Sequence, residues 1–470
     1  MRRMKSAERF SVSMPGLSHF ARKVKAVEHK TLRIRVDALA RVEGEGGIEL
    51  HVRDGRVLDH RFRIFEPPRF FEAFLLGRSY TEVPDITARI CGICPVAYQM
   101  SSVLALERAL GVEVDEPVRV LRRLMYCGEW IESHALHVLF LHAPDFLRLA
   151  DAFGIARLYP DMFRKGLELK KAGNDLVSLI GGREVHPVNM KVGGFHRMIA
   201  QAELDTLKER LKRARDHALD LVAWVSGFSF PDFSRDYEFV ALCHPTEYPM
   251  AEGEVTSSLG LTLKSDEVED IFVEEQVDHS HALHASIAGR EGYVVGPLAR
   301  FNLNHERLSP LARQAVQDAK LDAPCTNPFR SIVVRAVEIL QACDDALTIL
   351  EGRGLRGEAL LPDIQVRAGR GSACTEAPRG LLHHRYELDE AGLVRAARIM
   401  PPTSQNQRSI ESDLLHLVEA SADLGEERLT WLCEQAVRNY DPCISCATHS
   451  LRPGTPRVDG WRRNDHSSPR

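Results

Sequence analysis

The chain has 470 residues, of which 44% are hydrophobic and 27% charged, a composition typical of a soluble globular protein with one large domain or two or three smaller ones. Its formal net charge is −5, whereas nucleic-acid-binding proteins usually have an excess of basic residues, so we expect no nucleic-acid partner. No apolar run approaches the ~18 residues of a transmembrane helix, and no apolar segment follows the basic N-terminal residues, so we expect no transmembrane segment, no secretory signal and a cytoplasmic location.

Hydrophobic periodicity divides the chain into four parts. Residues 1–30 are basic and polar without periodicity and are expected to form a flexible N-terminal extension. Residues 31–68 alternate apolar and polar side chains between turns that contain glycine, which predicts a small antiparallel β meander. Residues 69–449 have mostly helical periodicity and are expected to form the catalytic body. Residues 450–470 have no apolar period and are expected to form a tail.

The body is expected to be mainly helical. Segment 203–225 is the clearest case, because its leucines and alanines recur every three to four residues. Residues 230–300 are expected to contain short strands and loops. The predicted fold class is therefore mainly α with small antiparallel β parts (α+β). The other expected helices span residues 101–110, 116–142, 161–179, 307–319, 329–350, 409–420 and 426–438.

Two Cys-x-x-Cys pairs are the most informative feature of the sequence. Cys91 and Cys94 precede an expected helix, and Cys443 and Cys446 follow one. Two intervening residues let both sulfurs of a pair reach one ion, and four sulfurs suit zinc, an iron–sulfur cluster or nickel. Zinc ribbons separate their pairs by only ~15–20 residues, whereas roughly 350 residues intervene here. From spacing alone, a structural zinc and a buried catalytic metal remain equally open.

Further motifs surround these pairs in a fixed order. Together with the cysteines, they resemble the large subunit of nickel–iron hydrogenases over residues 35–449. One such motif is weak evidence, but the ordered set is specific. The resemblance implies a long-helix bundle around a buried dinuclear metal site and the reversible oxidation of H2 to protons and electrons. The motifs are Arg41-Val-Glu43-Gly44, Arg69-Phe-Phe-Glu72, Arg89-x-Cys-Gly-x-Cys94, Gly181-Gly-x-x-x-His186-Pro187, Gly296-Pro-Leu-Ala-Arg300, Glu376-Ala-Pro378-Arg379-Gly380 and Asp441-Pro-Cys-x-x-Cys-x-x-His449.

The resemblance implies which residues bind the metals. Cys91, Cys94, Cys443 and Cys446 would hold nickel, and Cys94 and Cys446 would also bridge to an iron that carries CO and cyanide ligands. Thiolates are soft ligands that suit a redox-active nickel. Heterolysis of H2 needs a Lewis acid and a nearby base, which a metal and a terminal thiolate such as that of Cys443 supply together.

Supporting side chains are implied in the same way. Glu43 would relay protons from Cys443, although these residues by themselves favour a turn carboxylate. Arg379 would lie over the metals, paired with Asp441. His134 and His137 share a helical face with Trp130, so they are expected in the core. The remaining supporting positions are Pro378, Thr403 as a donor to a cyanide, and His186, for which a hydrogen-bonded core histidine is as good an interpretation.

The resemblance also implies a magnesium ion away from the nickel. Its ligands would be Glu72, the backbone carbonyl near Ile399, and His449. Oxygen ligands suit this hard cation, whereas an imidazole is less usual. Members of the family are made as precursors and cut after the terminal histidine, so residues 450–470 are expected to be removed by a maturation endopeptidase that acts after His449.

Three positions depart from the residues common in the family. Glu45 follows the Glu43-Gly44 pair, Tyr98 stands four residues after Cys94, and Ser133 occupies a position that is often aspartate. These departures look like the cytoplasmic multisubunit branch that couples H2 to NAD(P).

Electrons are expected to leave through a partner. The six remaining cysteines are isolated and cannot assemble an iron–sulfur cluster of familiar spacing. This predicts an iron–sulfur small subunit, with flavin and iron–sulfur subunits beyond it for NAD(P). The segment 352–357 matches G-x-G-x-x-G but follows a helical pattern, so we expect a helix end and a loop there and nicotinamide binding in a partner.

Three other interpretations remain. An H2-sensing regulatory subunit would use the same site, but such sensors commonly lack a cleavable tail. A respiratory-complex relative would share the fold, but that family has lost the cysteine pairs. A structural zinc protein is the third possibility.

Overall fold

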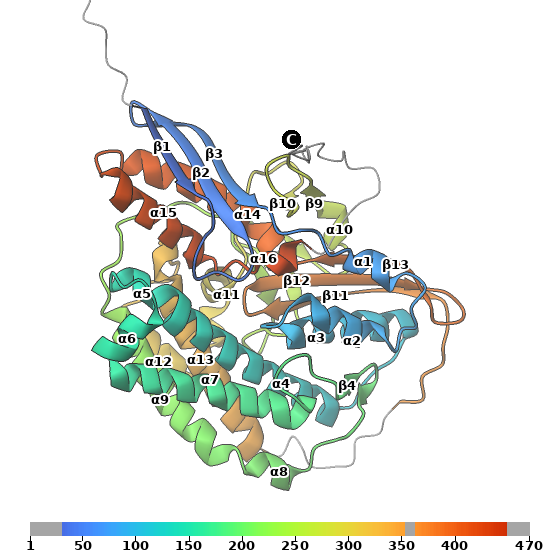
Figure 1. The fold of residues 1–470 in the computed structure, drawn as a ribbon. Helices are drawn as coiled ribbons and strands as arrows, with labels where there is room; N and C mark the ends of the chain where they lie inside the picture. The colour runs from blue at the N-terminus through green and yellow to red at the C-terminus, as the bar shows by residue number, and fades with distance from the viewer. Residues whose placement is uncertain (1–30, 353–361, 449–470) are drawn as a thin grey trace, which may run out of the picture.

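The computed structural model describes residues 31–352 and 362–448 (Figure 1). The expected extension 1–30, the tail 450–470 and residues 353–357 of the glycine-rich segment lie outside the described residues. The fold class predicted from the sequence, mainly α with small antiparallel β parts, is confirmed.

Residues that alternate in hydrophobicity at the start of the described chain form an antiparallel sheet. Its strands are β1 (Thr31–Val36), β2 (Gly46–Arg53) and β3 (Arg56–Ile64), in the order β1-β2-β3. Ile34 lies opposite Leu50, and both are fully buried. One face of the sheet therefore packs inward, against α14 (Pro402–Ala420) and α15 (Glu426–Asn439).

Four long helices form the main helical layer, at the lower left of Figure 1. Helix α4 (Glu116–Ala135) packs against α7 (Pro160–Gly181) and α13 (Ser331–Glu351), and α9 (Lys208–Ser226) packs against α7 and α13. Helix α13 is buried along most of its length, which explains why its sequence is apolar nearly all round.

Two predicted helices differ in detail from the structure. The segment predicted as one helix at 116–142 changes at Ala135, and Leu136–His142 continues as a π-helix. The segment predicted at 203–225 is two helices, α8 (Gln201–Asp205) and α9, because the N–H of Thr206 turns back to the carbonyl of Glu203 in a tight turn.

A second three-stranded sheet was not predicted from the sequence. Strands β11 (Gly369–Ala377), β12 (Gly380–Leu388) and β13 (Val394–Met400) pair in that order, and α3 (Pro95–Leu110) covers β11 and β12. Most side chains of β11 and β12 are buried whichever way they point. Such strands lack the alternation that identifies a strand from its sequence.

The remaining elements are short and connect these layers. The small sheets are β6 (Val240–Cys243), β7 (Glu254–Ser257) and β8 (Thr262–Leu263); β9 (Phe272–Glu275) with β10 (His284–Ile287); and β4 (Met190–Lys191) with β5 (Gly194–Phe195). The other helices are α1 (Phe71–Leu75), α2 (Val83–Thr87), α5 (Ala143–Phe146), α6 (Ala152–Leu158), α10 (Val268–Ile271), α11 (Pro297–Asn304), α12 (Pro310–Asp318) and α16 (Ile444–Ala447), with 3-10 turns at Ala88–Ile90, His305–Arg307 and Pro328–Arg330.

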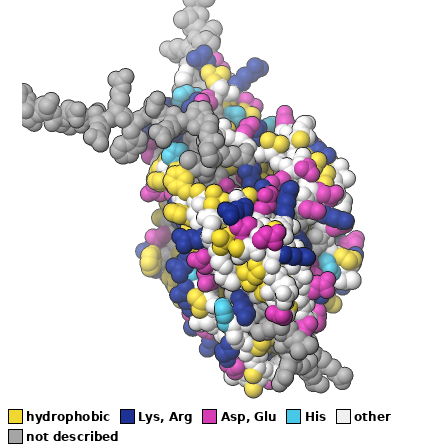
Figure 2. Space-filling model, turned by 90° about the vertical axis from the view of Figure 1, so that its right-hand side faces the viewer, with side chains coloured by type: hydrophobic (Ala, Val, Ile, Leu, Met, Phe, Trp, Pro, Cys, Tyr) yellow, Lys and Arg dark blue, Asp and Glu magenta, His cyan; other side chains and the backbone are white. Residues whose placement is uncertain are grey.

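The surface agrees with the small net charge. On the face drawn in Figure 2, basic and acidic side chains are interspersed with apolar ones. Among the described residues, no helix combines the length and the apolar character that crossing a membrane requires.

The contact between α4 and α7 depends on glycine. A Cβ atom added to Gly173 would lie 2.5 Å from the carbonyl oxygen of Gly128 and 2.6 Å from the amide nitrogen of Glu132. We expect Gly173→Ala to force the helices apart and destabilise the protein by about 1–3 kcal/mol. Thermal unfolding measures this loss. The control is Gly227→Ala, because that added Cβ meets nothing closer than 3.5 Å; equal unfolding midpoints for the two variants would contradict the prediction.

Candidate metal centre

The two cysteine pairs meet in the interior. Cys91 Sγ lies 3.5 Å from Cys443 Sγ, and Cys94 Sγ lies 3.7 Å from Cys446 Sγ. All four sulfurs are within 4.8 Å of one another, and each residue is at most 3% exposed. Thiolates bound to one ion at ~2.3 Å are about 3.8 Å apart in a tetrahedron, which the two distances between the pairs approach. Cys443 Sγ and Cys446 Sγ lie closer together, at 2.7 Å, so these two sulfurs would have to move apart to share an ion.

A segment near the start of the described chain holds the second cysteine pair in place. Glu43 pairs with Cys443 in a parallel β-bridge, and the N–H of Ile444 donates to the Glu43 carbonyl at 3.0 Å. The Arg69 guanidinium donates both to the carbonyl of Ile90, at 2.7 Å, and to the carbonyl of Ser445. Arg69 therefore joins the loop before Cys91 to the loop between the other two cysteines.

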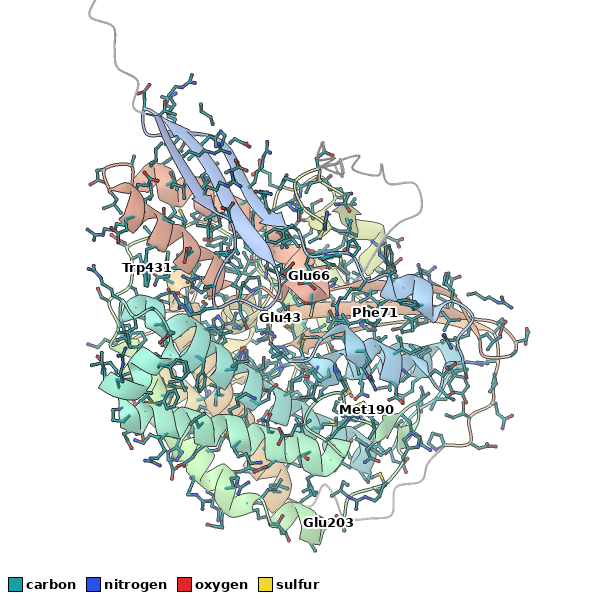
Figure 3. The ribbon with its side chains drawn as sticks, in the orientation of Figure 1. Glu43, Glu66, Phe71, Met190, Glu203 and Trp431 are labelled. Atoms are coloured by element: carbon teal, nitrogen blue, oxygen red, sulfur yellow. The ribbon has the colours of Figure 1, made fainter. Side chains whose placement is uncertain are left out.

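The side chain of Glu43 reaches the same cluster. The thiol of Cys443 donates to Glu43 Oε2 at 3.1 Å, and the N–H of Ser445 donates to that oxygen at 3.0 Å. Gly44 has φ +90°, and a Cβ there would lie 2.5 Å from Glu66 Oε2, so only glycine fits. Glu43 lies near the middle of the molecule in Figure 3, with Glu66 above it.

The chemistry of the cluster fits a bound cation. Burial raises the pKa values of Cys94, Cys443 and Cys446. The neighbouring sulfurs raise that of Cys443 further. Burial also acts to raise the pKa of Cys91, but hydrogen bonds from the other sulfurs outweigh it and lower that pKa. Four thiolates can share this dry space only if positive charge compensates them, which a soft metal ion supplies.

Arg379 supplies one fixed positive charge beside the sulfurs. The residue is 2% exposed. Its Nε donates to the Asp441 carbonyl at 3.0 Å, and one terminal nitrogen lies 3.2 Å from Asp441 Oδ1. The other terminal nitrogen is 3.5 Å from Ser133 Oγ. The structure thus brings Arg379 and Asp441 together, two residues before Cys443.

Arg300 supports the loop that carries Arg379. It donates to the carbonyls of Ala377, at 2.8 Å, and Pro378, at 3.0 Å. Its other contacts are ion pairs with Glu338 and Glu376, and all three side chains are at most 1% exposed. Pro378 therefore positions the loop through its carbonyl. The sequence motif contained Arg300, but only the fold reveals this support.

The structure also places other predicted residues: Thr403 and His186 contact the segments that carry the cysteines. The hydroxyl oxygen of Thr403 accepts from the Cys443 N–H at 3.0 Å, which puts Thr403 beside the cluster. His186 Nδ1 lies 2.8 Å from the carbonyl oxygen of Ala88, in the turn before Cys91. His134 and His137 are buried: His134 lies 3.0 Å from Glu338, and His137 contacts the Arg438 carbonyl at 2.9 Å and lies 3.9 Å from Asp441 Oδ1.

The expected magnesium ligands are partly together. Glu72 Oε1 accepts from the N–H of Ile399 at 2.8 Å, so the carboxylate and this stretch of β13 are neighbours. His449 lies outside the described residues, but Thr448, immediately before it, accepts from the Arg69 N–H at 2.8 Å.

Two residues near the cysteines were missed as site components. Glu129 accepts from the backbone N–H groups of Val96 and Ala97 at the start of α3, at 2.7 and 3.0 Å. It therefore caps the helix that follows Cys94. Tyr98 is buried on the same helix, and its hydroxyl has no hydrogen-bond partner in the described part of the protein. A tertiary contact such as that of Glu129 leaves no signal in the sequence.

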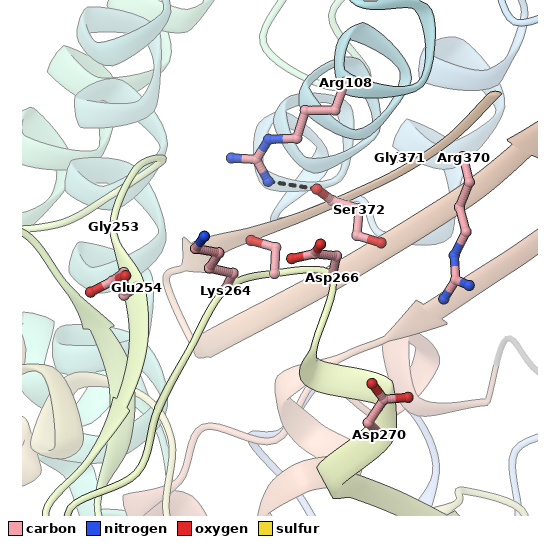
Figure 4. A pocket seen from close by; sticks show the side chains of 10 residues that line it. Arg108, Gly253, Glu254, Lys264, Asp266, Asp270, Arg370, Gly371 and Ser372 are labelled. Carbon is pink, nitrogen blue, oxygen red and sulfur yellow. Dashed lines mark hydrogen bonds between the residues drawn. The ribbon is translucent and has the colours of Figure 1, made fainter.

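A surface cavity of about 560 Å³ lies beside β11 (Figure 4). None of its lining residues belongs to the cysteine cluster. Arg108 is held there by the carbonyl of Ser372, at 2.5 Å. Basic and acidic side chains are mixed in the lining, so we assign it no ligand. The charged lining residues are Arg108, Lys264, Arg370, Glu254, Asp266 and Asp270.

Comparison with known proteins identifies relatives over nearly the whole chain. A family model described as nickel-dependent hydrogenase matches residues 69–157. The alpha subunit of sulfhydrogenase 2 from Pyrococcus furiosus is 35% identical over 434 residues, which cover 89% of this chain and 99% of that protein. The beta subunit of the NAD-reducing hydrogenase HoxS from Cupriavidus necator is 27% identical over 465 residues, covering 89% and 95%.

A solved structure has the same fold. It is the crystal structure of an NAD+-reducing [NiFe]-hydrogenase in the H2-reduced state, which matches with a TM-score of 0.80 and 28% identity over 89% of this chain and 99% of that one. The fold expected from the sequence motifs is thereby confirmed.

Arg300 gives a test of the support beneath the centre. Removal of its charge in Arg300→Met leaves two buried carboxylates without their partner, so we expect a loss of about 3–5 kcal/mol in the free energy of unfolding. The control is Arg119→Met, which removes an exposed ion pair with Glu252 and should cost at most about 1 kcal/mol. Denaturant unfolding compares the two variants, and similar losses would contradict the buried role.

Glu376 gives a test in the pH dependence of stability. Burial raises its pKa from 4.5 to about 7, and Arg300 offsets this only in part. The folded chain therefore binds more protons than the unfolded chain between these values, so stability falls as the pH rises through them. Between about pH 5 and about pH 8, we expect the free energy of unfolding of the wild type to fall by up to ~3 kcal/mol relative to that of Glu376→Gln. Denaturant unfolding at both pH values measures the difference; a constant difference would refute it.

Proposed function

The chain belongs to the large-subunit family of nickel-dependent hydrogenases, and we propose that it catalyses the reversible oxidation of H2 at a nickel–iron centre held by Cys91, Cys94, Cys443 and Cys446. The convergence of these four buried sulfurs carries the proposal. When bound, such a centre supplies a redox-active Lewis acid. Cys94 and Cys446 would also contact the iron, whose remaining ligands we propose to be CO and cyanide.

The residues around the sulfurs have separate tasks in this proposal. When H2 splits heterolytically, the electron pair of the H–H bond would go to the bound centre and the Cys443 sulfur would accept the proton, which would then pass to Glu43 over a separation of 3.1 Å. The Ser445 N–H fixes the accepting oxygen of Glu43. Arg379 holds positive charge beside the sulfurs, and Asp441 holds Arg379 in place. The burial of the four cysteines keeps water from the reacting groups.

The outer positions complete the proposed centre. Thr403 fixes the backbone of Cys443 and has its hydroxyl proton left to donate to a cyanide. His186 positions the turn before Cys91. We assign a magnesium ion to Glu72, the Ile399 backbone and His449, which supports the neighbouring chain segments. The catalytic unit then draws on the meander, residues 31–68, as well as on the body, residues 69–449.

The proposed oxidation of H2 releases electrons, so the proposed partners are proteins that accept them. In the described part of the chain, the cysteines other than these four do not gather into a second cluster. We propose that electrons pass to an iron–sulfur small subunit and on to NAD(P) through flavin and iron–sulfur subunits. The likeness to NAD-reducing relatives supports this branch, and it implies a cytoplasmic location. We also propose that a maturation endopeptidase removes residues 450–470.

Metal analysis tests the centre directly. Purified complex should contain nickel and iron, with infrared bands of CO and cyanide. A complex that contains zinc alone and lacks those infrared bands would contradict the proposal. Cys443→Ser should lose nickel or turnover, because it replaces a soft thiolate with a hydroxyl; full H2 uptake by that variant would also contradict the assignment.

Glu43 provides the test of proton transfer. Glu43→Gln keeps the size of the side chain but removes the base, so we expect nickel and iron to stay bound while H/D exchange falls by about 10²–10⁴-fold. The control is Glu45→Gln, an exposed carboxylate two residues away. An exchange rate in Glu43→Gln that equals the control rate would show that protons leave by another route.

A further inference from the structure

A second group of metal-binding side chains lies outside the cysteine cluster. His279, His284 and Glu411 each offer one ligand atom, and these atoms are within 4.8 Å of one another. His279 lies in the loop between β9 and β10, His284 begins β10, and Glu411 lies in the middle of α14. Figure 1 shows β9 and β10 beside β3 and α14, and contacts join α14 to both β10 and β3.

The group is separate from the four cysteines. Thr403, near the start of α14, contacts Cys443, whereas Glu411 is eight residues further along the same helix. At 1.5 Å per residue, this separation is about 12 Å along the helix axis. Nothing in the proposed hydrogenase reaction uses these three residues.

A hydrogen-bonded ion pair accounts for only part of the group. His279 Nε2 lies 2.7 Å from Glu411 Oε1, and that oxygen also accepts from the Phe62 N–H at 2.9 Å. The other carboxylate oxygen, Oε2, is 3.8 Å from His284 Nδ1, which is too long for a hydrogen bond. His284 is 2% exposed, and its Nε2 has no hydrogen-bond partner among the described residues. The ion pair thus does not include His284, whose Nδ1 is the nitrogen nearer to Glu411.

We propose that His279, His284 and Glu411 bind a single divalent ion of the zinc class. Two imidazole nitrogens and one carboxylate oxygen form a known ligand set for zinc, with bonds of ~2.0–2.2 Å and a fourth position for water. Ligand atoms around such an ion are about 3.4 Å apart. The observed separations are 2.7 Å from His279 to Oε1 and 3.8 Å from His284 to Oε2. Because they involve different oxygens of Glu411, the carboxylate or the imidazoles must rotate to set one oxygen at that spacing from both nitrogens.

The protonation states favour this ligand set. Burial lowers the pKa of His284 to about 4, despite the nearby Glu411 charge, so the imidazole is neutral and its lone pair is available. Burial acts to raise the pKa of Glu411, but the hydrogen bonds from His279 and the Phe62 N–H, together with the nearby imidazoles, outweigh it and lower that pKa. The positive charge of Arg408, one turn earlier on α14, is already paired with Glu275.

The site would fasten a loop to the body of the protein. The loop that carries His279 is also attached through His281, whose N–H donates to the Ile64 carbonyl at 2.8 Å and whose Nδ1 lies 3.1 Å from the Glu66 carbonyl oxygen. Its neighbour Ser280 accepts from the Gln276 side chain within the same loop. An ion bound by all three ligands would tie this loop to α14. The side chains of His279 and Glu411 are 21% and 13% exposed, so water can reach the fourth position.

Zinc binding to the assembled hydrogenase complex tests the proposal. The complex is stripped of loosely bound metal with a chelator, dialysed against Zn²⁺, and analysed for zinc, nickel and iron. We expect about one zinc per chain beyond the nickel and iron in wild type, and close to none in the double variant His279→Gln/His284→Gln. The control is His416→Gln, an exposed histidine further along α14, which should keep the zinc.

The same samples distinguish a lost site from a lost fold. Nickel content, iron content and H2 uptake should be unchanged in the double variant, because its residues do not contact the cysteines. Co²⁺ in place of zinc should give visible ligand-field bands in wild type and in the control but not in the double variant. If the double variant does not assemble, Glu411→Gln is measured in the same way. Equal zinc content in wild type and in an assembled variant, or no zinc in wild type, overturns the proposal.

Discussion

The parallel bridge between Glu43 and Cys443 joins segments that are 400 residues apart in the chain. It places the carboxylate of one segment on the thiol of the other and sets the position of the second cysteine pair. Arg69 adds a second connection, since its guanidinium contacts a carbonyl from each cysteine loop. Loop closure over such a length is costly in entropy, and the helices and sheets between these segments bring them together.

Buried charge is the second requirement of this centre. Sulfurs in a dry interior need compensating positive charge, and a fixed arginine beside them provides part of it. Arg379 is held by Asp441, and its loop rests on Arg300, which is neutralised in turn by Glu338 and Glu376. Each buried charge has its partner, so the network keeps its geometry without exposure to water. Loss of one member costs far more than loss of a surface pair for this reason.

Sequence patterns predicted the parts of this protein that leave a local signal. The meander alternates, the long helices have a period of three to four residues, and the cysteine pairs are recognisable from their spacing. Strands β11 and β12 were not predicted because they are buried on both faces. The roles of Glu129 and Arg300 were not predicted because they depend on contacts with residues 32 to 78 positions away, and no local pattern records such pairs. The family motifs included Arg300 but gave no reason for it.

The departures from the family pattern gain a physical meaning in this network. Ser133 stands where aspartate is common, and its hydroxyl lies 3.5 Å from Arg379. A hydroxyl carries no charge, so Asp441 is the carboxylate in contact with Arg379 within the described residues. Besides Asp441, the groups that act electrostatically on Arg379 are the sulfurs of Cys443, Cys94 and Cys91. Tyr98 is a second departure: burial raises its pKa further above the ordinary value, so the phenol is neutral near Cys446. Neither residue adds a titratable charge near pH 7, so the proposed transfer of a proton from Cys443 has Glu43 as its base.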